Sequence, residues 1–202
     1  RIYGGLRFYE RLEIKNAIAY LKIIFNNNDN PSFERSISNP TRGVGEKTLG
    51  KIRQTAQKYN ISYIKASAKL IDEGSISGRG GSGLRDYLEF VAGCKSFIED
   101  NSLSDLMQLI IKESGLYSYH AKEAGEKGKT RTENLEELIT ATKNFEQSVK
   151  EDKTNTEIAE NYLDVISLDA GDRQAAEHDD AAQLMTMHSA KGLEFKLVLL
   201  TG

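Results

Sequence analysis

The chain has 202 residues, with 27 Lys and Arg against 30 Asp and Glu, so its formal net charge is -3. Its single cysteine, Cys94, excludes a disulfide framework and a cysteine-based zinc site. No apolar run approaches the roughly 18 residues that a membrane span needs. With two prolines, no tryptophan and no visible signal peptide, we expect a mainly α, cytoplasmic protein that has no membrane partner.

The charge is unevenly distributed along the chain. Residues 1–72 carry 13 Lys and Arg against 6 Asp and Glu, a net +7, whereas residues 73–202 carry 14 against 24, a net -10. A chain of this kind can present a basic face to phosphates even though its total is acidic. The alternative is an ordinary fluctuation of charge, and the average alone argues mildly against nucleic acid as a partner.

Apolar residues recur at helical spacing over most of the chain. The first such segment, 10–25, ends in the helix-breaking run 26–31, after which Ser32 is expected to cap a short helix through Ile37. A tight loop follows over 40–45. Further helices are predicted over 47–59, 61–71, 84–98, 103–112, 130–149 and 156–167. The remaining features are connections: a loop or frayed helix start over 75–83, a helix end at Gly115, and a flexible charged connection over 125–129.

The chain changes character towards its end. After an acidic, loop-like stretch over 169–180, strands are expected over 182–188 and 195–200, with a turn or short helix between them. The second strand is a continuous apolar run, which is typical of a parallel strand buried on both faces. Because the chain offers too few other strands to flank it, we expect a fragment whose strands belong to a domain completed elsewhere.

The loop Thr41-Arg42-Gly43-Val44-Gly45 lies between two predicted helices and resembles the helix-hairpin-helix element that grips duplex DNA. Its glycines permit positive φ, and Val44 fills the junction. Amides at the start of the next helix then form a site for anions. We expect this loop, with Lys47, to bind DNA, and Lys51 and Arg53 to add charge nearby. The alternative is a helix–helix turn with incidental glycines.

We assign no catalytic role to the glycine-rich segments, the histidines or the cysteine. Gly128-Lys129-Thr130 is not a P-loop, because the P-loop spacing requires glycine where Glu123 stands. We expect a flexible basic loop near duplex DNA, or a plain solvated loop, at this point. The run Gly78–Gly83 follows no strand, so it is interpreted as a flexible joint rather than a dinucleotide-binding loop. The three histidines are too dispersed to bind a metal, and Cys94 is expected in the core.

The segment Gln183-Leu184-Met185-Thr186-Met187-His188-Ser189-Ala190-Lys191-Gly192-Leu193-Glu194-Phe195 closely resembles motif V of superfamily 1 DNA helicases of the UvrD, PcrA and Rep type. Ile2–Lys15 resembles the stretch before the 2B domain of these helicases, and Thr41–Gly45 their duplex-contacting hairpin. Thr130–Leu138 resembles another motif of the family. The four segments occur in the family's order and with about its spacing, so the resemblance covers essentially the whole chain.

The resemblance implies a particular organisation of domains. Such helicases have two RecA-like motor domains, 1A and 2A, and their helical 2B domain is inserted into 2A. By resemblance, residues 1–17 are the end of the first part of 2A, 18–179 are the 2B domain, and 180–202 begin the second part of 2A. The implied fold is mainly α, with 2B inserted in an incomplete RecA-like α/β domain.

The resemblance also implies roles for residues of motif V. Thr186 and His188 match positions that contact the single DNA strand, and Glu194 matches a position that reaches the nucleotide ribose. Lys191 and Gly192 lie in the turn that faces the ATP cleft.

Residues outside motif V are expected to hold the domains together. Arg131 and Asn134 match a motif that braces 2B against its neighbours. Arg7, Arg11 and Glu13 are expected to form ion pairs in the region of the 2A–2B hinge.

The parent protein is, by resemblance, an ATP-dependent 3′-to-5′ DNA helicase of repair or replication. Its implied cofactors are ATP and Mg²⁺, and its partners are a single-strand/duplex DNA junction and repair or replication proteins. This chain has no P-loop, Asp-Glu pair or arginine finger, so we expect no catalytic residue in it and no activity of its own. One alternative is a helix-hairpin-helix DNA-binding module without a motor, which has no use for motif V. Another is a helical protein-interaction domain, which the basic N-terminal third argues against.

Overall fold

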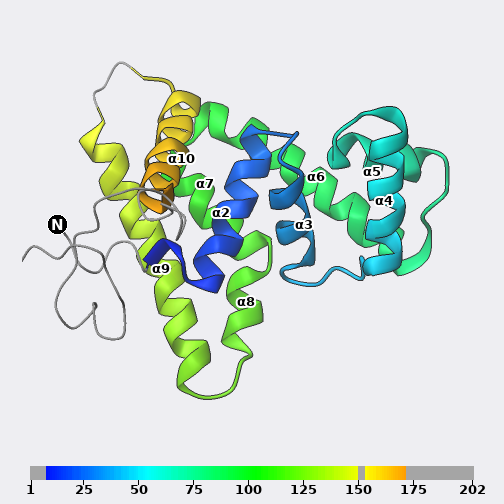
Figure 1. The fold of residues 1–202 in the computed structure, drawn as a ribbon. Coiled ribbons are helices and arrows are strands. Elements are labelled where there is room, and N and C mark those ends of the chain that lie inside the picture. The colour runs from blue at the N-terminus through cyan, green and yellow to red at the C-terminus, as the bar shows by residue number, and fades with distance from the viewer. Residues whose placement is uncertain (1–7, 150–152, 172–202) are drawn as a thin grey trace, which may run out of the picture.

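The computed structural model describes residues 8–149 and 153–171, and this part of the chain consists of α-helices without a strand (Figure 1). In chain order the helices are α2 (Leu12–Phe25), α3 (Asn30–Ser38), α4 (Glu46–Tyr59), α5 (Tyr63–Asp72), α6 (Gly78–Asp100), α7 (Leu103–Glu113), α8 (Leu116–Ala121), α9 (Glu126–Ser148) and α10 (Asn155–Gly171). The mainly α class is therefore confirmed for the described residues. The strands expected over 182–188 and 195–200 lie outside those residues, and the insertion into a RecA-like domain stays a prediction.

The predicted helices are present, with differences at several of their ends. α6 begins at Gly78 and not at residue 84, so the stretch 78–83 is helical. Asp29, and not Ser32, caps α3, because its Oδ1 accepts a hydrogen bond from the Ser32 amide at 3.0 Å. α9 begins at Glu126, so the flexible connection predicted over 125–129 is wrong. α10 continues to Gly171, so the first residues of the expected acidic loop are helical.

Packing explains the early start of α9. Gly125 turns the chain with φ at 77°, and Gly128 then lies against the backbone at the end of α8. A Cβ at Gly128 would approach the His120 carbonyl oxygen to 2.8 Å, so only glycine permits this contact. Gly115 is in the left-handed conformation, with φ at 86°, directly after α7, which confirms the predicted helix end.

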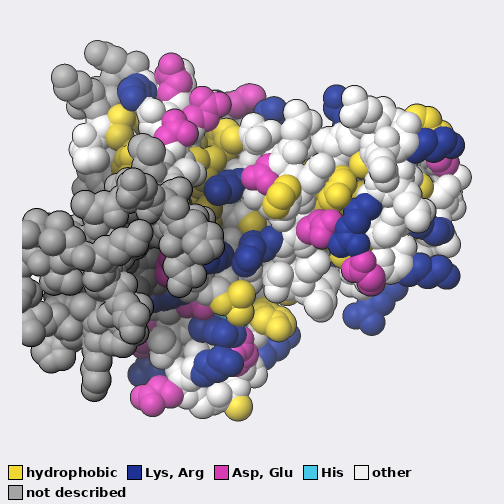
Figure 2. All heavy atoms as spheres, in the orientation of Figure 1, with side chains coloured by type: hydrophobic (Ala, Val, Ile, Leu, Met, Phe, Trp, Pro, Cys, Tyr) yellow, Lys and Arg dark blue, Asp and Glu magenta, His cyan; other side chains and the backbone are white. Residues whose placement is uncertain are grey.

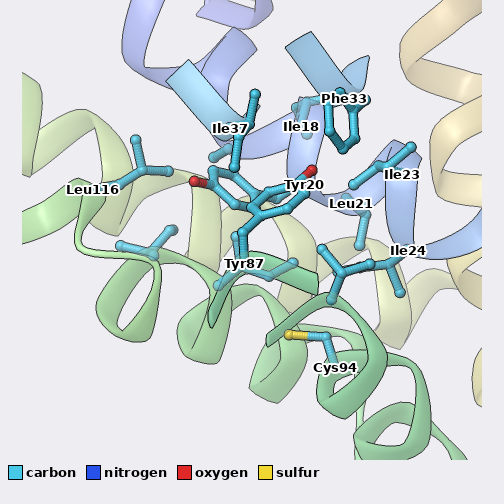
Figure 3. Close-up of a cluster of buried hydrophobic side chains, with 14 of the residues drawn as sticks. Ile18, Tyr20, Leu21, Ile23, Ile24, Phe33, Ile37, Tyr87, Cys94 and Leu116 are labelled. Carbon is cyan, nitrogen blue, oxygen red and sulfur yellow. The ribbon is translucent and has the colours of Figure 1, made fainter. Parts of the chain in front are cut away.

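The core is organised around α2. Ten of its 14 residues are buried, and it contacts α3, α6, α7 and α9. A helix that is apolar on most of its circumference is stable only when neighbours cover it on several sides. Figure 3 shows its residues Tyr20 and Leu21 close to Tyr87 of α6, with Phe33 of α3 above them. The domain boundary predicted near Ala17 would fall in the middle of this helix, at a residue with no exposed surface.

The long helix α6 connects the two ends of the molecule. At about 1.5 Å per residue its 23 residues span roughly 35 Å. It contacts α5 at one end and α7 and α10 at the other, while α2 crosses it between them. In Figure 1, α4 and α5 consequently lie at the opposite end from α9 and α10. Within the described ranges no helix combines the length and apolar character required to cross a membrane.

Candidate nucleic-acid interface

The loop that joins α3 to α4 has the conformation expected of a hairpin between helices. Gly43 has φ at 75°, in the left-handed region that favours glycine. Val44 is 9% exposed and packs into the core, whereas Thr41, Gly43 and Gly45 are exposed. The turn therefore presents its backbone to solvent and anchors itself through one apolar side chain.

The first turn of α4 leaves backbone donors open. Gly45 occupies the cap position, and no side chain caps the helix. The amides of Thr48 and Leu49 donate to the Gly45 carbonyl oxygen at 2.9 and 3.0 Å. Within the described residues, no hydrogen bond reaches the amides of Glu46 and Lys47. These N–H groups lie at the positive end of the helix dipole, where they can donate hydrogen bonds to a bound anion.

The start of α6 packs directly against the backbone of this loop. A Cβ at Gly80 would lie 3.2 Å from the Gly43 carbonyl oxygen, and a Cβ at Gly83 would overlap the Arg42 carbonyl oxygen. Gly80 and Gly83 are three residues apart and so share one helix face. The interpretation of 78–83 as a flexible joint is therefore wrong, because its glycines permit close packing between a helix and a loop.

Arg42 holds the loop from the inside. Its guanidinium donates hydrogen bonds to the backbone carbonyl oxygens of Ser36 (3.3 Å), Pro40 (3.0 Å) and Ser114 (2.7 Å). It also lies over the rings of Tyr20 and Tyr87, at 5.4 and 5.6 Å from their centroids. Arg42 thereby ties the loop to the end of α3 and to the turn between α7 and α8. The sequence suggested a DNA contact for this side chain, but the structure gives its guanidinium partners within the protein.

Buried tyrosine hydroxyls complete the support of the loop. The Tyr20 hydroxyl directs its single hydrogen between the carbonyl oxygens of Ser36 (2.6 Å) and Asn39 (2.9 Å), and the Tyr87 hydroxyl bonds with Ser36 Oγ at 2.6 Å. Burial raises the pKa of Tyr20 and of Tyr87 above the ordinary tyrosine value. Both hydroxyls therefore stay protonated and neutral at physiological pH.

The other cations named from the sequence differ in their availability. Arg53 donates to both carboxylate oxygens of Glu34, at 2.6 and 2.8 Å, and also pairs with Glu46. These hydrogen bonds lower the pKa of Glu34 and raise that of Arg53. Lys51 donates to the Ser75 carbonyl oxygen at 2.9 Å. Lys47 is exposed, and no ion pair or hydrogen bond within the described residues involves its side chain.

Arg79 is a cation at this site that the sequence reasoning missed. Its side chain crosses the loop, so that a Cβ at Gly43 would lie 2.8 Å from its Cγ and 3.3 Å from its Nε. Arg79 is exposed and forms no ion pair with any described residue. Figure 2 shows Lys and Arg side chains gathered at the end of the molecule where α4 and α5 lie. The only sequence signal for Arg79 is the glycine spacing of 78–83, which permits helix packing as well as flexibility.

A second polar cluster braces α9 against α2. Arg11 donates to Asn134 Oδ1 at 2.5 Å, and Asn134 donates to Glu13 Oε1 at 2.6 Å. Arg131 donates to both oxygens of Glu123, at 2.6 and 2.9 Å, and its Nε lies 3.6 Å from Glu13 Oε2. Arg131 and Asn134 thus brace α9 against the start of α2, while the predicted bracing of 2B against its neighbours stays a prediction. The expected ion pairs of Arg11 and Glu13 are present, because Arg11 lies 3.6 Å from Glu137 Oε2 and Glu13 pairs with Arg131. The role of these contacts at a domain hinge stays a prediction.

Buried His120 extends this cluster into α8. Its Nδ1 lies 2.6 Å from Glu123 Oε1, and its side chain is 1% exposed. Hydrogen bonds from His120 and Arg131 lower the pKa of Glu123. The carboxylate therefore stays charged at neutral pH and holds the start of α9 against α8.

The motif V residues lie outside the described part of the chain. These are Thr186, His188, Lys191, Gly192 and Glu194, and Arg7 near the N-terminus is outside it as well. Their expected roles stay predictions. Among the described residues, no group of three or more His, Cys, Asp or Glu side chains is arranged to hold a metal ion.

Comparison with known proteins gives matches along the chain. The family model described as UvrD-like helicase C-terminal domain matches residues 1–76 and 85–202. DNA helicase II of Escherichia coli (strain K12) is 44% identical over 202 residues, which are 100% of this chain and 28% of that protein. ATP-dependent DNA helicase PcrA of Bacillus subtilis (strain 168) is 33% identical over 203 residues, which are 100% of this chain and 27% of that protein. The chain thus spans less than a third of the length of these relatives.

Proposed function

The chain belongs to the family of UvrD-like helicase C-terminal domains, and we propose that it is part of an ATP-dependent 3′-to-5′ DNA helicase in which the helical region α2–α10 holds duplex DNA. The exposed loop Thr41–Gly45 carries this proposal. Its open amides, the positive end of α4 and the free Lys47 ammonium form a surface suited to phosphate. Contacts of this kind position a duplex without reading its bases.

Rigid support of the loop favours a clamp over an incidental turn. Arg42 and the tyrosines hold it from the core, and the glycines of α6 fix it from the side. A site that is already in its bound geometry loses little conformational entropy when the ligand arrives. An incidental turn requires no such support, whereas a phosphate clamp gains affinity from it.

We assign the nucleotide chemistry mainly to the rest of the parent protein. ATP and Mg²⁺ would supply phosphoryl transfer there. Of this chain's residues, Lys191, Gly192 and Glu194 are proposed to face the nucleotide, and Thr186 and His188 the single strand. The contacts of Arg11 and Asn134 would then connect the clamp to the motor domain. Repair or replication DNA is the proposed substrate.

Duplex binding by the 202-residue chain tests this proposal. Fluorescence anisotropy with a 20-base-pair duplex, repeated over a range of salt concentrations, gives the affinity and its salt slope. Each phosphate contact is expected to contribute about -0.9 to the slope of log K against log salt. Absence of duplex binding, or binding that does not change with salt, would contradict the clamp.

A matched pair of glycine variants localises the binding. Gly45→Val places a side chain where nothing lies within 4 Å, on an extended backbone with φ at -95° that accepts valine. We expect it to weaken duplex binding several-fold while the fold is retained, because the new methyl groups shield the open amides. Gly93→Val, also in open space but within α6, is the control. Equal affinities for the two variants would place the duplex elsewhere.

A further inference from the structure

The loop contains one arginine whose donors are already used. Arg42 gives hydrogen bonds to three carbonyl oxygens, and its planar group lies over Tyr20 and Tyr87. A phosphate could recruit this guanidinium only if those carbonyls, which lie at the ends of helices, lost their partner. Losing these hydrogen bonds would cost more free energy than a solvent-exposed contact with a phosphate provides.

A second arginine reaches the outer surface of the same loop. Arg79 extends from the first turn of α6 across Gly43, and its exposed side chain has no ion pair within the described residues. The contacts of Gly80 and Gly83 with the loop backbone fix the first turn of α6, and hence Arg79, relative to Gly43. The acid that follows the loop, Glu46, forms its ion pair with Arg53.

We infer that Arg79 supplies the guanidinium that contacts a duplex phosphate at this loop, and that Arg42 is a positioning residue that acts through the loop. This inference rests on the proposed function and adds α6 to the duplex-binding surface. Arg79 lies in the stretch 77–84, between the two segments that the family model matches. The ligand is the DNA backbone, since a guanidinium fork fits a phosphate with two parallel hydrogen bonds.

Salt-dependent duplex binding of charge variants tests the assignment. Arg79→Gln removes the fork, and we expect the salt slope to fall in magnitude by about 0.9, with a several-fold loss of affinity near 100 mM salt. Arg79→Lys keeps the charge and is expected to keep most of the slope. Lys143→Gln removes a charge from an exposed position on α9, at the other end of the molecule, and is expected to leave the slope unchanged. Thermal melting of each variant checks that the fold is retained.

Arg42→Lys separates positioning from contact. It keeps the positive charge but cannot reach three carbonyls, so we expect a lower melting temperature, whereas Arg79→Gln melts as the wild type does. A wild-type salt slope in Arg79→Gln, while the wild-type chain binds duplex with a clear salt dependence, would overturn the role of Arg79 and leave the clamp standing. Failure of the wild-type chain to bind duplex would overturn both.

Discussion

Gly83→Ala should push the loop away from α6 without changing any charged residue. A Cβ at position 83 would lie well inside 3.0 Å of the Arg42 carbonyl oxygen, and real Cβ atoms do not come that close to such an atom. Neither backbone segment can move away easily, because Gly83 is part of helix α6 and the Arg42 guanidinium anchors the loop through its hydrogen bonds. The loop must therefore move outward and strain the hydrogen bonds of Arg42.

Two opposing effects determine the size of the change. Replacing glycine by alanine in a helix interior stabilises a protein by up to about 1 kcal/mol. Overpacking typically costs 1–3 kcal/mol, and a weakened charged hydrogen bond adds about 1.5 kcal/mol. We therefore expect a net loss of about 2 kcal/mol, which lowers the melting temperature of a domain of this size by roughly 4–8 °C.

Thermal melting followed by circular dichroism measures this effect against an internal control. Gly93→Ala lies in the same helix, and nothing lies within 4 Å of its new Cβ. It should raise the melting temperature slightly through helix propensity alone. If Gly83→Ala proves as stable as Gly93→Ala, the close packing of α6 on the loop is refuted, and the fixed placement of Arg79 with it.

Three further predictions concern reactivity, pH and catalysis. Cys94 is 1% exposed and burial raises its pKa to about 12, so a thiol reagent at pH 8 should label it only as fast as the protein unfolds; rapid labelling of the folded protein would contradict its burial. Hydrogen bonds from Arg53 lower the pKa of Glu34, so this pair stabilises the fold above the ordinary pKa of a glutamate and loses that effect as the pH falls through the lowered pKa of Glu34. Because both side chains are about a third exposed, Glu34→Gln should cost no more than about 1 kcal/mol at pH 7 and progressively less as the pH is lowered, as urea titrations over a series of pH values would reveal; a cost that does not change with pH would exclude the ion pair as its source. The isolated chain should show no DNA-stimulated ATP hydrolysis, and robust turnover by pure protein would contradict the assignment of ATP chemistry to other parts of the parent.

Local patterns in the sequence predict the helices and the shape of the hairpin loop. Helical spacing of apolar residues locates α2 and the helices after it, and the Gly-Val-Gly pattern predicts the positive φ of Gly43 and the burial of Val44. These features depend on neighbours in the chain, so they can be read from short segments.

The features that sequence reasoning missed depend on contacts between distant segments. Arg42 turns inward because the Ser114 carbonyl, 72 residues away, needs a donor. Gly83 is required because Arg42 of the loop, 41 residues earlier, lies against it, and the same glycine spacing is compatible with a flexible joint. Whether a surface arginine is free or paired likewise depends on which acids fold beside it, as Arg53 and Glu34 illustrate.

The central claim is that the loop between α3 and α4, together with the start of α6, binds the duplex. Amide chemical shifts of the ¹⁵N-labelled chain, followed by NMR during titration with a short duplex, test it residue by residue. We predict that the largest changes fall on residues 43–48 and 78–80, and that α8 and α9 change little. Changes concentrated on α8 and α9, with none at Gly43 or Arg79, would contradict the account.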